Sequence, residues 1–280
     1  MAILKEDTPQ GKTKTRSLKP YKSFETNTVT GEVYRRDALP FLRSLPDESA
    51  DLLFIDPPFN LGKKYAQAVN IDRRPEADYW SWMLEVLSEG VRVIAIGGSL
   101  YLYHIPLWAM RFGAFLEQHL DLRHWIAISM KSGFARGERL YPAHYSLLYF
   151  TKGTPASFQR PKIDPTVCRN CHEMIKDYGG YKSIILEKGI NLSDFWEDLS
   201  PVRHSNYKSR SSNELPVKLT DRVLEISGNA GGTFIDPFSG AGTAVLSAAR
   251  AGMHFKACDI LLPNCRLLCR RLQTLENGDD

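Results

Sequence analysis

Residues 234–243, Phe-Ile-Asp-Pro-Phe-Ser-Gly-Ala-Gly-Thr, are the stretch of this sequence that decides the fold. An apolar strand pattern leads into a turn with two glycines, and a helix pattern begins near Thr243. In open α/β sheets, ligands bind beyond the carboxyl ends of the strands, where glycine lets the backbone approach closely and the next helix offers free N–H groups. The stretch therefore predicts either a ligand-binding turn or a turn that needs small residues for packing.

The surrounding sequence alternates strand and helix patterns. Residues 51–55 (DLLFI) form a short apolar run closed by two prolines, which predicts a buried parallel strand. Apolar side chains recur at helical spacing over 80–91, and Gly97-Gly98 is expected to end that helix. Further strands are expected at 99–105, 125–129, 144–152, 233–238 and 254–260, with helices over 213–227, over 243–252 and from Pro263. This alternation predicts an open, mostly parallel α/β sheet.

Composition fits one core with an inserted segment. Of 280 residues, 43% are hydrophobic, and no apolar run is long enough to span a membrane. The lysine-rich start is not a secretory signal, so the cytoplasm is the expected location. A net charge of +4 is compatible with a polyanionic partner. We predict a basic flexible tail at 1–25, which could instead lie along phosphates, and two halves of one domain at 26–152 and 213–280, separated by a polar segment at 153–212.

A second motif, Asp56-Pro57-Pro58-Phe59, directly follows the strand at 51–55. Two prolines fix the backbone and remove N–H donors, so an aspartate beside their carbonyls makes a cluster of acceptors able to hold an –NH2 group. Phe59 adds a flat surface on which a base can stack. A Pro-Pro pair often only ends a strand, but the acid, the prolines and the aromatic ring together favour a functional site.

These motifs and their order resemble the β class of amino-group DNA methyltransferases. In that class the catalytic motif precedes the cofactor motif, and target recognition lies between them. The resemblance runs from about residue 30 onward, and it includes residues 36–39 (RDAL), 45–49 (LPDES), 201–204 (PVRH) and 213–218 (NELPVK). It implies a Rossmann-like, S-adenosylmethionine-dependent methyltransferase fold with permuted motif order and a small inserted target-recognition segment.

The resemblance also implies roles for individual residues. Asp56 and the Pro57 carbonyl would accept hydrogen bonds from the target amino group, and Phe59 would stack on the flipped-out base. Asp259 would bind the ribose of the cofactor, as its place after a strand also suggests, and Asp37 would bind its adenine. The remaining cofactor-binding candidates are Asp236, Phe238, Ser239, Gly240, Gly242, Thr243, Asn213 and Lys218.

The polar segment at 153–212 is the candidate for target recognition, because basic and aromatic side chains are interleaved there. An ordinary solvated surface insertion is the alternative. The residues expected to contact double-stranded DNA are Arg160, Lys162, Arg203, His204, Lys208 and Arg210.

The pair Cys168 and Cys171 resembles half of a zinc knuckle. A structural zinc site needs four ligands, and the sequence holds no second CxxC pair. Cys265 and Cys269, four positions apart on the last expected helix, are better explained by packing. Zinc therefore remains a secondary expectation.

The sequence leaves four questions open. Asp56 favours N6 of adenine as the target, but most adenine-specific members have tyrosine where Phe59 stands, so N4 of cytosine is the alternative. The chain could also be a DNA-binding protein with an inactive methyltransferase fold. The resemblance suggests a homodimer and a restriction-modification context, but no residue pattern decides either.

Overall fold

The computed structural model describes residues 19–61, 73–129, 138, 140, 142–164, 177, 179–199 and 214–277. The strands are β1 (Lys22–Glu25), β2 (Thr30–Arg35), β3 (Ala50–Ile55), β4 (Ile94–His104), β5 (Asp121–Ser129), β6 (His144–Thr151), β7 (Lys162–Ile163), β8 (Ile190–Asn191), β9 (Phe195–Trp196), β10 (Thr233–Asp236) and β11 (His254–Asp259). The helices are α1 (Ala38–Arg43), α2 (Glu76–Val93), α3 (Pro106–Leu116), α4 (Lys182–Lys188), α5 (Val217–Ser227), α6 (Thr243–Arg250) and α7 (Leu262–Asn277).

Nine strands form one sheet in the order β1-β2-β11-β10-β3-β4-β6-β5-β9. The five central strands, from β2 to β4, pair in parallel. Strand β6 is antiparallel to both β4 and β5, and β1 is antiparallel to β2. The predicted open, mostly parallel sheet is confirmed.

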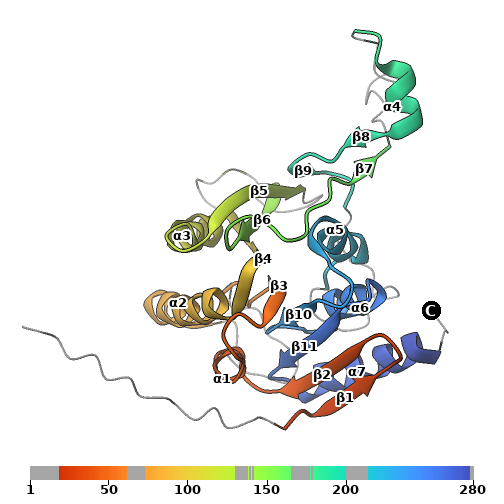
Figure 1. The fold of residues 1–280 in the computed structure, drawn as a ribbon. Helices are drawn as coiled ribbons and strands as arrows, with labels where there is room; N and C mark the ends of the chain where they lie inside the picture. The colour runs from red at the N-terminus through yellow and green to blue at the C-terminus, as the bar shows by residue number, and fades with distance from the viewer. Residues whose placement is uncertain are drawn as a thin grey trace, which may run out of the picture.

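Strand β3 lies in the middle of the sheet because its side chains are apolar on both faces. Leu52 and Phe54 join one core cluster, which α5, α6 and α7 cover. Leu53 and Ile55 point to the opposite face and join the cluster under α1, α2 and α3. Figure 1 shows the two helix groups on opposite sides of the sheet. A strand buried on both faces needs a continuous apolar run, which is what residues 51–55 predicted.

The N-terminal boundary of the fold differs from the prediction. Lys22–Glu25, assigned from sequence to a flexible tail, form strand β1 and pair with β2. Phe24 is buried against Phe255 of β11, with ring centroids 6.2 Å apart. One apolar side chain among lysines gives no periodic signal, so only its tertiary contact reveals the strand.

Strand β4 begins earlier than the sequence suggested. Helix α2 ends at Val93, and Gly97 does not stop a helix but lies inside the strand, in a left-handed conformation with φ +80°. The pairing register between β3 and β4 shifts here, because Ala50 pairs with Ile94 whereas Leu52 pairs with Ser99. Glycine at this position makes the bulge without the strain that a side chain would add.

The segment between the two halves of the sheet leaves the body of the molecule. Strands β7 and β8 pair only with each other. Helix α4, which lies between them in the sequence, stands farther out along a projecting arm (Figure 1). Helix α4 has no buried residue.

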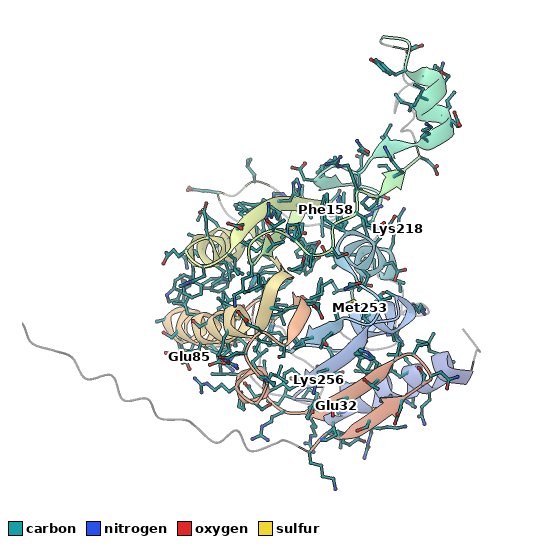
Figure 2. All side chains as sticks on the ribbon, viewed as in Figure 1. Glu32, Glu85, Phe158, Lys218, Met253 and Lys256 are labelled. Atoms are coloured by element: carbon teal, nitrogen blue, oxygen red, sulfur yellow. The ribbon has the colours of Figure 1, made fainter. Side chains whose placement is uncertain are left out.

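Near the opposite edge of the sheet, Glu32 and Lys256 form a cross-strand ion pair of 2.6 Å between β2 and β11 (Figure 2). Among the described helices, none is both long and apolar enough to cross a membrane.

Candidate active site

The two motifs singled out from sequence meet at one pocket. Strands β3 and β10 are parallel neighbours, with Phe234 opposite Leu52, so their carboxyl ends lie at the same edge of the sheet. A small pocket lies there, with a cavity volume of about 20 Å³. Its lining residues are Phe54, Asp56, Glu214, Leu215, Asp236, Phe238, Ser239, Ala241, Thr243 and Ala244. Residues far apart in the chain, from the Asp-Pro-Pro-Phe motif and from the glycine turn, thus share one cavity.

Hydrogen bonds fix the glycine turn between β10 and α6. The buried Asp236 accepts from the Phe238 N–H at 2.9 Å, and the hydroxyl of Ser239 donates to the Cys258 carbonyl at 3.0 Å. Gly242 is the N-cap of α6 in a left-handed conformation, with φ +84°. A Cβ at Gly242 would lie 2.2 Å from Leu268 of α7. Glycine is therefore required here by backbone conformation and by space.

Asp259 and Asp37 stand beyond the ends of neighbouring strands, next to the turn. The carboxylate of Asp259 accepts from the Gly240 N–H at 3.0 Å, from the Leu261 N–H at 2.7 Å and from the Asn264 amide at 3.0 Å. Asp37 caps α1 by accepting from the Leu39 N–H at 3.1 Å. Neither residue lines the pocket of Asp56 and Asp236. Asp259 thus fixes the glycine turn directly, and its predicted contact with ribose stays a prediction.

The pocket has an acidic lining. Asp56, Glu214 and Asp236 contribute carboxyl groups, and its described lining contains no lysine or arginine. Arg271 of α7 pairs with Glu214 at 3.2 Å from behind and also donates to the Ala241 carbonyl. A pocket with this lining favours a ligand that carries positive charge.

Aromatic rings surround Phe59 of the Asp-Pro-Pro-Phe motif. Its ring stacks on His104 with centroids 4.7 Å apart, and it lies 5.8 Å from Tyr103 and 5.7 Å from Tyr145. Burial raises the pKa of Tyr103 well above its usual value, and the nearby charge of Asp56 raises it further. The carboxylate and the aromatic cluster therefore adjoin, as a site that binds a flat ring with an amino group requires.

Sequence reasoning missed these supporting aromatic residues. Tyr103 and His104 end strand β4, and Tyr145 lies near the start of β6. A fourth residue, Tyr79 of α2, donates its hydroxyl hydrogen to the Pro58 carbonyl at 2.6 Å, and its oxygen lies 2.7 Å from Nε2 of His104. The only signal in the sequence is that aromatic residues occupy the ends of strands next to the motif.

Lys218 belongs to the stretch predicted to close the cofactor pocket. On α5, its ammonium pairs with Asp198 at 2.7 Å (Figure 2). Asp198 also accepts two hydrogen bonds from Arg222, at 3.0 and 2.7 Å. From the same predicted stretch it is Glu214 and Leu215 that line the pocket. Lys218 thus helps to attach the segment after β9 to α5, and its predicted role at the cofactor pocket stays a prediction.

Asp198→Asn is expected to lower the free energy of unfolding by about 1 kcal/mol at pH 7, because the buried Arg222 loses its charged partner. Arg222 holds the pKa of Asp198 well below its usual value, with Lys218 adding to the effect. A depressed carboxyl pKa gives stability that is present above about pH 4 and is lost as the pH falls further.

Thermal unfolding of the wild type and the variant should therefore differ at pH 7 and converge as the pH drops below 4. The exposed Asp194, four residues earlier, gives the control Asp194→Asn, which should unfold like the wild type. An equal loss in both variants would contradict this role of Asp198.

Of the predicted DNA-contacting residues, the structure describes two. Arg160 is exposed, with its guanidinium 5.9 Å from the ring centre of Phe158, and Lys162 of β7 donates to the Asn191 side chain at 2.5 Å. Both lie at the base of the projecting arm. The predicted residues outside the described part of the chain are Arg203, His204, Lys208, Arg210, Asn213, Cys168 and Cys171.

The described cysteines are packing residues. Cys258, Cys265 and Cys269 are buried free thiols, and burial raises the pKa of each. Within the described ranges, no group of three or more histidine, cysteine, aspartate or glutamate side chains is arranged to hold a metal ion. The zinc expectation rested on Cys168 and Cys171, which those ranges do not include.

Comparisons with known proteins complete this description. Residues 50–268 match a family described as DNA methylase. Over 257 residues the chain is 42% identical to the type II methyltransferase M.BamHI of Bacillus amyloliquefaciens, and the alignment covers 91% of this chain and 59% of that protein. The chain therefore spans about three fifths of the length of this relative.

Two solved structures share the fold. The PvuII DNA methyltransferase, described as cytosine-N4-specific, has a TM-score of 0.63 at 16% identity and covers 87% of this chain and 86% of its own. The complex of M1.HpyAVI with SAM has a TM-score of 0.59 at 16% identity and covers 86% and 98%. The predicted Rossmann-like methyltransferase fold is confirmed.

Proposed function

Because this chain belongs to the DNA methylase family, we propose that it transfers a methyl group from S-adenosyl-L-methionine to an exocyclic amino group of a base in double-stranded DNA. The observation that carries the proposal is the shared pocket, in which Asp56 of the catalytic motif and Asp236 of the glycine turn line the same cavity. Methyl transfer requires the acceptor amino group and the methyl donor to be held side by side. Sites at the ends of two neighbouring parallel strands would meet this requirement.

The residues at the glycine turn fit the cofactor. S-adenosyl-L-methionine supplies an electrophilic methyl group on a positively charged sulfur, and an acidic pocket complements that charge. Gly240 and Gly242 keep side chains out of the turn. Helix α6 begins at Thr243, and the first N–H groups of a helix have no acceptor within the helix, so they are suited to a ligand. We assign the inner end of the site to Asp236, Phe238, Ser239 and Thr243, and the outer end to Asp259 and Asp37.

The Asp-Pro-Pro-Phe motif fits the amino group of a base. The nitrogen lone pair of such a group is delocalised into the ring, so the group is a weak nucleophile. Acceptance of its hydrogens by Asp56 and by the Pro57 carbonyl would direct the lone pair toward the methyl donor, with no covalent intermediate. Phe59, supported by Tyr103 and Tyr145, would stack on a base flipped out of the duplex.

We propose adenine as the first candidate base, because Asp56 stands where cytosine-specific members of the β class usually have serine. Cytosine is the second candidate, because Phe59 stands where most adenine-specific members have tyrosine. The loss of one hydroxyl leaves the stacking surface in place and so does not argue against activity.

The projecting arm is the proposed contact with DNA. Arg160 and Lys162 lie at its base, and Lys182 and Lys188 bound the exposed helix α4. Exposed lysine and arginine side chains on a segment that stands away from the core are suited to contacting phosphates.

A homodimer remains a sequence prediction. Measuring the mass of the protein in solution tests it.

The test is to incubate the protein with unmethylated genomic DNA and S-adenosyl-L-methionine labelled in its methyl group. After digestion, nucleosides are separated by mass spectrometry, with heat-inactivated protein as the control. Label in the deoxynucleoside of N6-methyladenine supports adenine, whereas label in the deoxynucleoside of N4-methylcytosine keeps the mechanism and changes the base. Absence of label together with absence of cofactor binding would overturn the proposal in favour of an inactive methyltransferase fold.

A further inference from the structure

A chain of buried polar groups lies directly behind the Asp-Pro-Pro-Phe motif. Tyr79 of α2 is 1% exposed and His104 at the end of β4 is fully buried. The Tyr79 hydroxyl oxygen is 2.6 Å from the Pro58 carbonyl oxygen and 2.7 Å from Nε2 of His104. On its other side, the His104 ring stacks against Phe59 at 4.7 Å, with an interplanar angle of 28°. Two groups of the motif thus rest on the same buried pair.

The direction of each hydrogen bond follows from its partners. The backbone N–H of Ile105 donates to Nδ1 of His104 at 2.8 Å, so Nδ1 is an acceptor and carries no hydrogen. A neutral imidazole then carries its single hydrogen on Nε2 and donates it to the Tyr79 oxygen. That leaves the hydroxyl hydrogen of Tyr79 for the Pro58 carbonyl. The resulting chain runs in one direction only, from His104 through Tyr79 to Pro58.

Protonation of His104 would break this arrangement. Burial lowers the pKa of His104 to about 3, so the ring is neutral throughout the physiological range. A charged ring would also direct a second N–H at Ile105, whose own N–H already points at Nδ1. The neutral ring with its hydrogen on Nε2 is therefore the state that satisfies every member of the chain.

The motif needs such an anchor because of its prolines. Pro57 and Pro58 have no N–H, so this stretch of backbone can be held by hydrogen bonds only through its carbonyl groups. Tyr79 holds the Pro58 carbonyl. This contact sets the orientation of the peptide group between Pro58 and Phe59, which is the next one along the chain after the Pro57 carbonyl. Acceptors that act on a developing charge distribution work best when they are fixed in advance.

We propose that Tyr79 and His104 are positioning residues for methyl transfer, which hold the backbone next to the amino-group acceptors and the stacking ring of the motif. This inference rests on the proposed function of the site. Neither residue is exposed to the pocket, so their effect on the reaction passes through Pro58 and Phe59.

Tyr79→Phe removes one oxygen and keeps the ring. It is expected to lower kcat by roughly 10- to 100-fold, since a buried carbonyl and a buried N–H lose their partner. The KM for DNA and the Kd for S-adenosyl-L-methionine should stay within a few-fold of the wild type. The matched control is Tyr101→Phe. Tyr101 is buried on the same strand as His104, but its hydroxyl forms a hydrogen bond of 2.7 Å with Ser227 of α5, away from the motif. Its kcat should be unchanged.

Two replacements of His104 separate positioning from simple packing. The side-chain amide of Gln reaches to about the place of Nε2 and can donate to Tyr79, whereas the shorter Asn can only replace Nδ1 as the partner of Ile105. His104→Gln should therefore retain most of kcat, and His104→Asn should lose about as much as Tyr79→Phe. Equal kcat values for the two replacements, or an unchanged kcat in Tyr79→Phe, would overturn the proposal while leaving the proposed function in place.

A measurement that does not depend on activity tests the hydrogen-bond direction in the wild type. Nitrogen-15 NMR of the histidine side chains, with His104 assigned through His104→Gln, should show a neutral ring protonated on Nε2 from pH 5 to 8. A ring protonated on Nδ1, or one that titrates in this range, would contradict the inferred chain even in a protein that transfers no methyl group.

Discussion

Asp56→Ala is expected to lower the rate of methyl transfer by roughly 1000-fold while the cofactor still binds. Asp56 is the one carboxylate of the Asp-Pro-Pro-Phe motif, and it follows directly on the buried strand β3 at the pocket it shares with Asp236. Without it, the amino group of the base keeps only backbone acceptors, and its lone pair is no longer directed toward the methyl donor. Single-turnover transfer to DNA, followed by nucleoside analysis, measures the loss.

Two companion variants show whether the loss is chemical. Asp56→Asn keeps one acceptor oxygen, so it should lose less activity than the alanine variant. Asp51 lies at the opposite end of the same strand, where its carboxylate accepts from the Thr233 N–H at 2.7 Å. Asp51→Asn preserves an acceptor there and should transfer methyl groups at the wild-type rate. Turnover by Asp56→Ala close to that of the wild type would contradict the proposed mechanism.

Gly242→Ala should damage both the fold and the cofactor site. The backbone at Gly242 has φ +84°, which costs an alanine about 1–2 kcal/mol, and the new Cβ would lie 2.2 Å from Leu268. Relief of this overlap requires the packed Leu268 side chain to leave its rotamer, or α7 or the turn to shift, at a further cost of roughly 1–3 kcal/mol. We expect a lower free energy of unfolding and a loss of thermal stabilisation by S-adenosyl-L-methionine.

Gly231→Ala is the matched control for conformation. Gly231 has almost the same backbone angle, φ +81°, but a Cβ there would meet no atom within 4 Å. This variant should lose about 1–2 kcal/mol of stability and keep its stabilisation by the cofactor. If both variants behaved alike, the contact with Leu268 would have no part in holding the turn.

The parts of the fold that sequence predicted are those with local signals. The apolar run 51–55 lies in strand β3, and the stretch 234–243 holds the end of strand β10, the glycine turn and the start of α6. That β3 and β10 are neighbours is a different matter. It depends on the pairing of Phe234 with Leu52, and no periodicity within either segment specifies its partner.

The unpredicted parts depend on tertiary contacts. Tyr79 directly precedes the helical pattern predicted over 80–91. It is buried, and its hydroxyl bonds to Pro58, a contact that the pattern does not predict. Lys218 matched a motif stretch, yet its partner Asp198 comes from a region with no periodic signal. Gly97 was predicted to end a helix because glycine is common there, but it lies at a bulge in β4. The pairing of β3 with β4 sets this role, and the local sequence does not.

The pairing of β3 with β10 also bears on how the protein is made. Asp51 and Thr233 bond to one another across 182 positions of the chain, so during synthesis the first half of the pocket leaves the ribosome long before the second. At typical bacterial and eukaryotic elongation rates the interval is roughly 10 to 40 s. Through that time β3 lacks one neighbouring strand, and its apolar edge is open to association with other nascent chains. The two halves of the pocket can therefore combine only after residue 244 has been synthesised, and we expect chaperone protection to matter most while β3 lacks β10.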